Sequence, residues 1–172
     1  MLAALAEAGI QCTYLLLPSL GAVITEVSTV FLGANSIHSN GAVSARAGTA
    51  LVAMLAKQHS VPVVVCCETY KYSEGVQLDS FTKNELGKCS HPGLARSNPH
   101  IIILAPLGER FQNFPSTKSR ESLVLENAPN LEILNPLYDL TPPANITAVV
   151  TEVGVIPPNS ISAIPVALGR LL

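Results

Sequence analysis

Short apolar runs alternate with helical patterns along the first half of the chain. A helical stretch over 2–8 ends at Gly9, and apolar runs follow at 11–17, 28–34 and 61–67. These runs are short and contain many β-branched residues, which is typical of strands. The third, "VPVVVCC", is apolar throughout, as expected of a strand that is buried on both faces of a parallel sheet.

Between these runs the apolar positions take helical spacing. Residues 20–27 place four apolar side chains on one helical face, and residues 44–59 repeat the spacing i, i+3, i+4, i+7, i+8. In the longer helix the predicted apolar face consists of Ala47, Ala50, Leu51, Met54 and Leu55. Strands and helices in this alternation predict βαβ units, and so an α/β fold with a Rossmann-like, doubly wound, mostly parallel sheet.

The second half of the chain is less regular. Residues 87–130 are rich in Ser, Pro, Asn and Gly, which predicts a loop-rich, partly mobile insertion. One apolar patch within it, at 101–104, is either a short strand or a loop anchor. Beyond it we expect an extended segment over 131–143, a capped helix over 141–154 and β structure over 160–172.

The chain shows no internal repeat and no linker, so residues 1–172 are expected to form a single domain. It opens on a helix that a doubly wound sheet would normally place after a strand. We therefore expect a partial domain, the C-terminal part of a longer protein, from which the first elements of the sheet are missing.

Composition narrows the functional classes. Hydrophobic residues make up 48% of the chain and charged residues 13%, whereas soluble domains carry about 25% charge. This indicates a surface covered by partners, or a fold that lacks one of its parts. The net charge of −2 and the absence of a Lys/Arg stripe argue against nucleic acid as a direct partner. Neither a membrane span nor a signal peptide is visible, which favours a cytoplasmic location.

Metal and cofactor sites are not expected from the sequence. The four cysteines form no disulfide framework, and Cys66 and Cys67 are interpreted as reduced thiols at a strand end. A metal site from Cys89, His91 and His100 would match no standard zinc spacing. No glycine-rich dinucleotide motif and no phosphate-binding P-loop are present.

The candidate site is the polar loop 35–44, which follows the second expected strand. Ligands of open α/β sheets bind beyond the carboxyl ends of the strands, and the N-terminus of the following helix favours anions. Arg46, in the expected first turn of that helix, is suited to a phosphate. Neutral hydrogen-bonding groups come from Asn35, Ser36, Ser39, Asn40 and Thr49. The alternative is a loop that only connects elements. Within the loop 35–44, His38 is the one residue whose side chain titrates near neutral pH, and the sequence identifies no carboxylate partner for it.

The run "GANSIHSNGAVSARAGT", which starts at Gly33, resembles the regulatory subunits of eukaryotic translation initiation factor 2B. That factor is the guanine-nucleotide exchange factor for initiation factor two. Methylthioribose-1-phosphate isomerase and ribose-1,5-bisphosphate isomerase share the same core. The segments "VCCETYK" (65–71), "VQLDSF" (76–81) and "NEL" (84–86) resemble those of the delta-type subunit.

This resemblance covers about 1–86 and 131–169 and implies an isomerase-type α/β domain in a subunit that controls translation initiation through protein contacts. The implied partners are the beta, alpha, gamma and epsilon subunits and initiation factor two. It also implies that an isolated fragment could homodimerise through the face otherwise given to beta. No cofactor is implied.

The resemblance to the isomerases also implies why this chain is not an enzyme. Their G-A-D-R aspartate is Asn35 here, and an amide cannot transfer the proton. A second acidic position is Ala42, and their Asn-Lys pair is Ala45-Arg46. Two alternatives stay open: a sugar-phosphate isomerase of the methylthioribose-1-phosphate type, or a non-catalytic sugar-phosphate or nucleotide sensor. For the sensor, the vestigial anion pocket would consist of Asn35, Asn40, Arg46 and Thr49.

Overall fold

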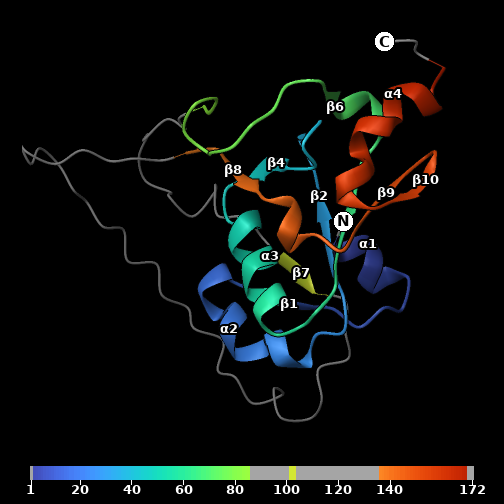
Figure 1. The fold of residues 1–172 in the computed structure, drawn as a ribbon. Helices are drawn as coiled ribbons and strands as arrows, with labels where there is room; N and C mark the ends of the chain where they lie inside the picture. Colours follow the sequence, from blue (N-terminus) through green and yellow to red (C-terminus); the bar gives the residue numbers. More distant parts are fainter. Residues whose placement is uncertain (1, 86–100, 104–135, 170–172) are drawn as a thin grey trace, which may run out of the picture.

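The computed structural model describes residues 2–85, 101–103 and 136–169 (Figure 1). Within them the strands form two four-stranded sheets and one two-stranded sheet, with helices packed beside them. The predicted α/β class is confirmed. Parallel pairing is confined to β2–β5, β5–β9 and β3–β6 among the described strands, and the other pairs are antiparallel.

The first four-stranded sheet has the order β10–β9–β5–β2. Its strands are β2 (Val30–Gly33), β5 (Val63–Cys66), β9 (Ala148–Thr151) and β10 (Gly154–Ile156). β2, β5 and β9 run parallel, and β10 returns antiparallel to β9. Val63, Val65 and Val149 are at most 1% exposed. The apolar run at 61–67 contains a central strand, as predicted, but only alternate side chains are buried: Val64 is half-buried and Cys66 exposed, so the expected burial on both faces was wrong.

The second sheet has the order β6–β3–β4–β8. Its strands are β3 (Ser36–His38), β4 (Val43–Arg46), β6 (Tyr72–Ser73) and β8 (Tyr138–Thr141). The polar loop expected over 35–44 is thus a β-hairpin, and this expectation was wrong. Ile37 and Val43 are buried in it, and Gly41 (φ +79°) closes its turn, since a three-residue hairpin loop needs one residue in the left-handed region.

Helix α3 (Thr49–Gln58) begins later than the predicted helix over 44–59, because 43–46 pair as strand β4. Its predicted apolar face is also wrong: Leu51 and Met54 are about half exposed, while Val52, Ala53 and Ala56 are buried. Small side chains on the inner face let the helix lie close to the sheets. Leu51 and Met54 are left outside, although their spacing is equally helical, and Leu55 packs against the edge of the core.

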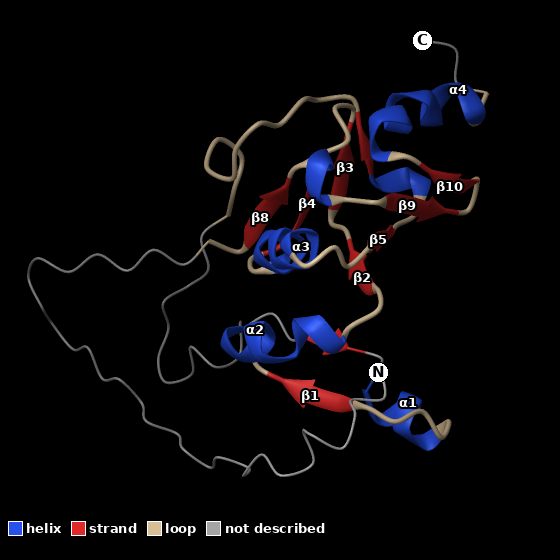
Figure 2. Cartoon of the chain, turned by 60° about the horizontal axis from the view of Figure 1, so that its bottom comes forward, coloured by secondary structure: helices blue, strands red, loops and turns tan. Residues whose placement is uncertain are grey.

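The N-terminal elements follow the predicted order. They are α1 (Leu2–Glu7), β1 (Thr13–Leu15), α2 (Leu20–Val23) and a 3-10 turn (Ile24–Glu26). The apolar patch in the insertion supplies strand β7 (Ile101–Ile103), which pairs antiparallel with β1. Strand β1 lies beside α1 and α2 (Figure 2), and its Leu15 packs against the core cluster that contains Val30 and Val63. The remainder of 87–130 lies outside the described residues, as do Cys89, His91 and His100.

The C-terminal predictions were largely wrong. The helix expected over 141–154 is replaced by a 3-10 turn (Pro143–Asn145) and the β9–β10 hairpin. "AVVTEVGVI" carries β-branched side chains that pair across a turn, and this outweighs its cap and proline signals. The tail expected as β structure is a 3-10 helix (Pro158–Ala163) followed by α4 (Ile164–Ala167). No helix among the described residues is long and apolar enough to span a membrane.

Replacement of Gly41 by alanine should destabilise the protein more than the same change at Gly9. Both glycines have positive φ, near +80°, so each alanine costs about 1–2 kcal/mol in the left-handed region. A Cβ on Gly41 would lie 2.3 Å from the Pro158 carbonyl oxygen, whereas nothing lies within 4 Å of one on Gly9. We expect Gly41→Ala to lose about 2 kcal/mol more free energy of unfolding in urea titrations. Equal losses would contradict this packing of hairpin and tail.

Candidate functional site

A hollow of about 360 Å³ opens where β2 ends beside β4, β8 and the start of α3. It is lined by Gly33, Ala34, Asn35, Ala45, Arg46, Thr49 and Tyr138. Asn35 is fixed there because its backbone N–H donates to the Ser44 carbonyl at 2.8 Å. The structure therefore brings together three of the four residues that the sequence selected, at the carboxyl end of a parallel strand.

The fourth residue, Asn40, does not line the hollow. It lies in the β3–β4 turn, where its Nδ2 donates to the Gln77 carbonyl at 2.9 Å. Its Oδ1 accepts from the backbone N–H of Ala42 at 3.3 Å. These two bonds hold the turn closed and attach it to the segment after β6. The side chain of Asn40 therefore stabilises the β3–β4 turn and does not contribute to the hollow.

The N-terminus of α3 is not open to an external anion in this structure. One carboxylate oxygen of Asp139, Oδ2, accepts from the backbone N–H groups of Gly48 at 2.7 Å and Ala50 at 2.9 Å. The chain thus caps its own helix with a negative charge, which the helix dipole favours. Sequence reasoning missed this cap because Asp139 is distant along the chain. Only the strand pairing of β8 with β4 brings it near.

Arg46 lies on strand β4 and not in the first helical turn. Its guanidinium carbon is 5.2 Å from the centroid of the Tyr138 ring, its cross-strand neighbour on β8. This cation–π contact holds the guanidinium at the edge of the hollow. The Thr49 hydroxyl donates to the Arg46 carbonyl at 2.7 Å.

The described residues that line the hollow include no Asp, Glu, His, Lys or Cys. Arg46 is the one charged residue among them, and Asn35 contributes an amide. His38 lies elsewhere, buried on β3, with its ring Nε2 3.3 Å from the Ser36 hydroxyl. Burial lowers the pKa of His38, and the charge of Lys83 lowers it further, so the imidazole is neutral at pH 7. The described residues hold no cluster suited to a metal ion.

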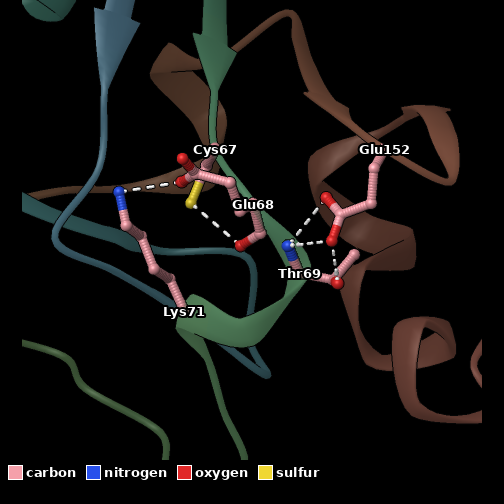
Figure 3. A network of polar contacts seen from close by, with 5 residues as sticks. All are labelled: Cys67, Glu68, Thr69, Lys71 and Glu152. Carbon is pink, nitrogen blue, oxygen red and sulfur yellow. Dashed lines mark hydrogen bonds and ion pairs between the residues drawn. The ribbon is translucent and has the colours of Figure 1, made fainter.

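A second polar network lies after β5 (Figure 3). The Glu152 carboxylate accepts from the Thr69 backbone N–H at 2.9 and 3.0 Å and from the Thr69 hydroxyl. Lys71 pairs with Glu68 at 2.9 Å. Burial raises the pKa of the Cys67 thiol to about 11, and the thiol donates to the Glu68 carbonyl. A protonated thiol is a poor nucleophile. The bonds between Glu152 and Thr69 join the segment after β5 to the β9–β10 turn.

These features define an α/β domain with a polar hollow at the carboxyl end of a parallel strand. The chain belongs to the initiation factor 2 subunit family, whose model matches residues 1–158.

Named relatives fall into two groups. The chain is 39% identical to the translation initiation factor eIF2B subunit delta of Schizosaccharomyces pombe, over 93% of this chain and 31% of that protein. It is 32% identical to the ribose 1,5-bisphosphate isomerase of Pyrococcus furiosus, over 90% of this chain and 40% of that enzyme. The chain thus spans less than half the length of either relative.

Solved structures agree on the fold. The structure of eIF-2B subunit delta from A. fulgidus matches with a TM-score of 0.65 at 26% identity, over 96% of this chain and 41% of that one. The tetrameric eIF2B-beta2-delta2 complex from C. thermophilum matches with a TM-score of 0.52 at 17% identity, over 86% of this chain and 33% of that one. The second likeness concerns the fold alone.

The Asp139 cap should leave a pH signature. Burial is the largest influence on the pKa of Asp139 and raises it above the usual 3.8, while the N–H groups of Ala50 and Gly48 oppose this. The folded state therefore holds its proton to a higher pH than the unfolded state does. The contribution of Asp139 to stability is full below pH 3.8 and falls as pH rises through the raised value. The free energy of unfolding of Asp139→Asn, relative to wild type, should rise over this window.

Urea titrations of both proteins between pH 3.5 and 7 measure this difference. Asp139→Ala is the matched control, since it removes both hydrogen bonds as well as the charge. At neutral pH we expect it to lose about 1–2 kcal/mol, the usual cost of a missing N-cap. A relative stability of Asp139→Asn that falls with rising pH would show that the folded state lowers the pKa of Asp139 and does not raise it.

Proposed function

We propose that this chain is part of a delta-type regulatory subunit of the guanine-nucleotide exchange factor for initiation factor two. It would control translation initiation in the cytoplasm through protein contacts. The observation that carries the proposal is the hollow itself, where Asn35 and Arg46 bring an amide and a cation but no proton-transferring group. Isomerisation of a sugar phosphate needs groups that remove and return a proton. The identity to a subunit delta over nearly the whole chain supports the same assignment.

The proposed partners are the beta, alpha, gamma and epsilon subunits and initiation factor two. A composition with only 13% charged residues supports extensive burial against other subunits. No cofactor is needed for such a role. The net charge of −2 is consistent with protein partners rather than a nucleic acid backbone.

Affinity purification of the full protein from cytosol should recover these subunits and initiation factor two, identified by native mass spectrometry. A tagged, unrelated α/β protein of similar size is the control. Recovery of the full protein alone, under conditions that keep the factor assembled, would overturn the proposal.

A second candidate function is that of a non-catalytic sensor of phosphorylated metabolites. It is favoured by the Arg46 guanidinium, which the Tyr138 ring holds beside Asn35 and Thr49 at the edge of the hollow. A guanidinium beside neutral donors is suited to a phosphate group. The isomerase alternative is less favoured, because the same hollow contains no acid–base pair.

Millimolar methylthioribose 1-phosphate, ribose 1,5-bisphosphate and inorganic phosphate test both alternatives. If the hollow is a sensor, one of them should raise the melting temperature saturably, by an amount equivalent to about 2.7 kcal/mol at a hundred times Kd. Arg46→Ala should remove this effect. Lys57→Ala, which removes a cation from the last turn of α3, should keep it. No isomerised product is expected, and turnover would revive the isomerase alternative.

A further inference from the structure

The turn between β3 and β4 contains an asparagine that is followed directly by a glycine. Asn40 and Gly41 lie beyond the last strand pair of this hairpin, Ile37 with Val43. The side-chain carbonyl carbon of an asparagine can be reached by the backbone nitrogen of the next residue. Glycine hinders this approach least, because it has no Cβ and the widest backbone freedom. Whether the pair reacts therefore depends on how the fold holds the two residues.

The reaction in question replaces the side-chain amide of Asn40 by a carboxylate. The Gly41 nitrogen attacks the side-chain carbonyl carbon, a C–N bond forms, and the amide group leaves as ammonia with the proton that the attacking nitrogen gives up. Water then opens the cyclic imide. Cleavage at the former side-chain carbonyl gives aspartate, and cleavage at the backbone carbonyl gives isoaspartate. Water is the one co-reactant of these steps.

The folded hairpin holds back the attacking nitrogen. The Gly41 N–H donates to the His38 carbonyl at 2.8 Å, and Gly41 is buried. The nitrogen must lose its proton before it can attack, and both burial and this hydrogen bond favour the neutral N–H over the anion. A Cβ on Gly41 would lie 2.3 Å from the Pro158 carbonyl oxygen, so the backbone is too closely packed to turn freely.

The side chain that would be attacked is held as well. Asn40 Nδ2 donates to the Gln77 carbonyl at 2.9 Å, and Asn40 Oδ1 accepts from the Ala42 N–H at 3.3 Å. The His38 N–H donates to the Ala42 carbonyl at 2.9 Å and closes the hairpin behind the turn. Both reacting groups are thus fixed by hydrogen bonds that an opening of the turn would break together.

The amide of Asn40 also attaches the exposed segment, residues 74–85, to the second sheet. Strand β8 holds the other end of this segment through Asn84, whose Nδ2 donates to the Tyr138 carbonyl at 2.7 Å. Of the two Asn40 bonds, the one to Gln77 needs the amide N–H. A carboxylate at position 40 would turn an oxygen toward the Gln77 carbonyl oxygen, and two acceptors repel each other. Loss of the amide therefore frees one end of the exposed segment.

We propose that Asn40 is a deamidation site whose reactivity is controlled by local opening of the β3–β4 turn. The closed turn protects the amide, and each opening exposes it. The product carboxylate releases the exposed segment from the second sheet. Because the amide is not restored, the product accumulates with the age of the protein and records how often the turn has opened.

Incubation of the full protein in mildly alkaline buffer, followed by peptide mapping in a mass spectrometer, tests the site. Conversion of Asn40 in native buffer should be at least about tenfold slower than in concentrated urea, where the turn is open. In urea, Gly41→Ala should slow the reaction several-fold, because its Cβ hinders the attack. No conversion of the wild type in urea would show that Asn40 is not such a site. Equal rates in the two buffers would show that the turn does not protect it.

Gln77→Ala tests whether a local opening is sufficient. The Gln77 side chain is 7% exposed and its Nε2 donates to the Asp79 carbonyl at 2.9 Å, so its loss loosens the carbonyl that holds Asn40. Val61→Ala is the matched control, because it weakens the core cluster that contains Val30, which includes no residue of the hairpin. At equal free energies of unfolding, Gln77→Ala should deamidate at least about threefold faster. Equal rates would overturn the local control.

Asn40→Asp reproduces the main chemical change of the product. Trypsin should cleave after Lys83, within the exposed segment, several-fold faster in this variant than in the wild type, because a released segment enters a protease more readily. Asn35→Asp makes the same change in the hollow, outside the turn, and should be cleaved like the wild type. Cleavage of Asn40→Asp at the wild-type rate would overturn the release of the segment.

Discussion

The carboxylate of Asp139 on the N-terminus of α3 is the contact on which the organisation of the candidate site depends. It joins the last strand of the second sheet to the helix that covers the core, across a long separation in sequence. The same strand places Tyr138 under Arg46 and binds Ser80 and Asn84 on its other flank. Helix, hollow and exposed segment therefore share one strand as their common support.

This arrangement places a cation and a capped helix N-terminus beside the same hollow. A helix N-terminus at the end of a parallel strand favours negative charge whatever its source. Here the chain supplies that charge internally, and Arg46 is held by an aromatic ring beside it. The hollow combines the Arg46 guanidinium with the amide of Asn35 and the hydroxyl of Thr49. Such a domain is suited to tasks performed by its surfaces.

Local patterns predicted the first half of the fold well and the second half poorly. The strand at 61–67 was recognisable because it is a short run of β-branched residues, although only alternate side chains are buried. Three of the four residues selected from the sequence line one hollow. The inner face of α3 could not be recognised from the sequence, because two alanines and one valine are buried while Leu51 and Met54 are exposed. The hairpin at 36–46, the β9–β10 hairpin and the Asp139 cap depend on pairing between distant segments. No local window contains that information.

The hydrogen bonds at the two ends of the stretch 86–136 have a consequence for chain length. The Leu137 N–H donates to the Glu85 carbonyl at 2.8 Å, and the Asn84 side chain bonds both backbone groups of Tyr138. These contacts hold the two ends of the stretch next to each other. Because closure entropy grows only with the logarithm of loop length, doubling such a stretch costs about 0.6 kcal/mol. Added length in this stretch is therefore inexpensive only where it leaves the pairing of β7 with β1 intact.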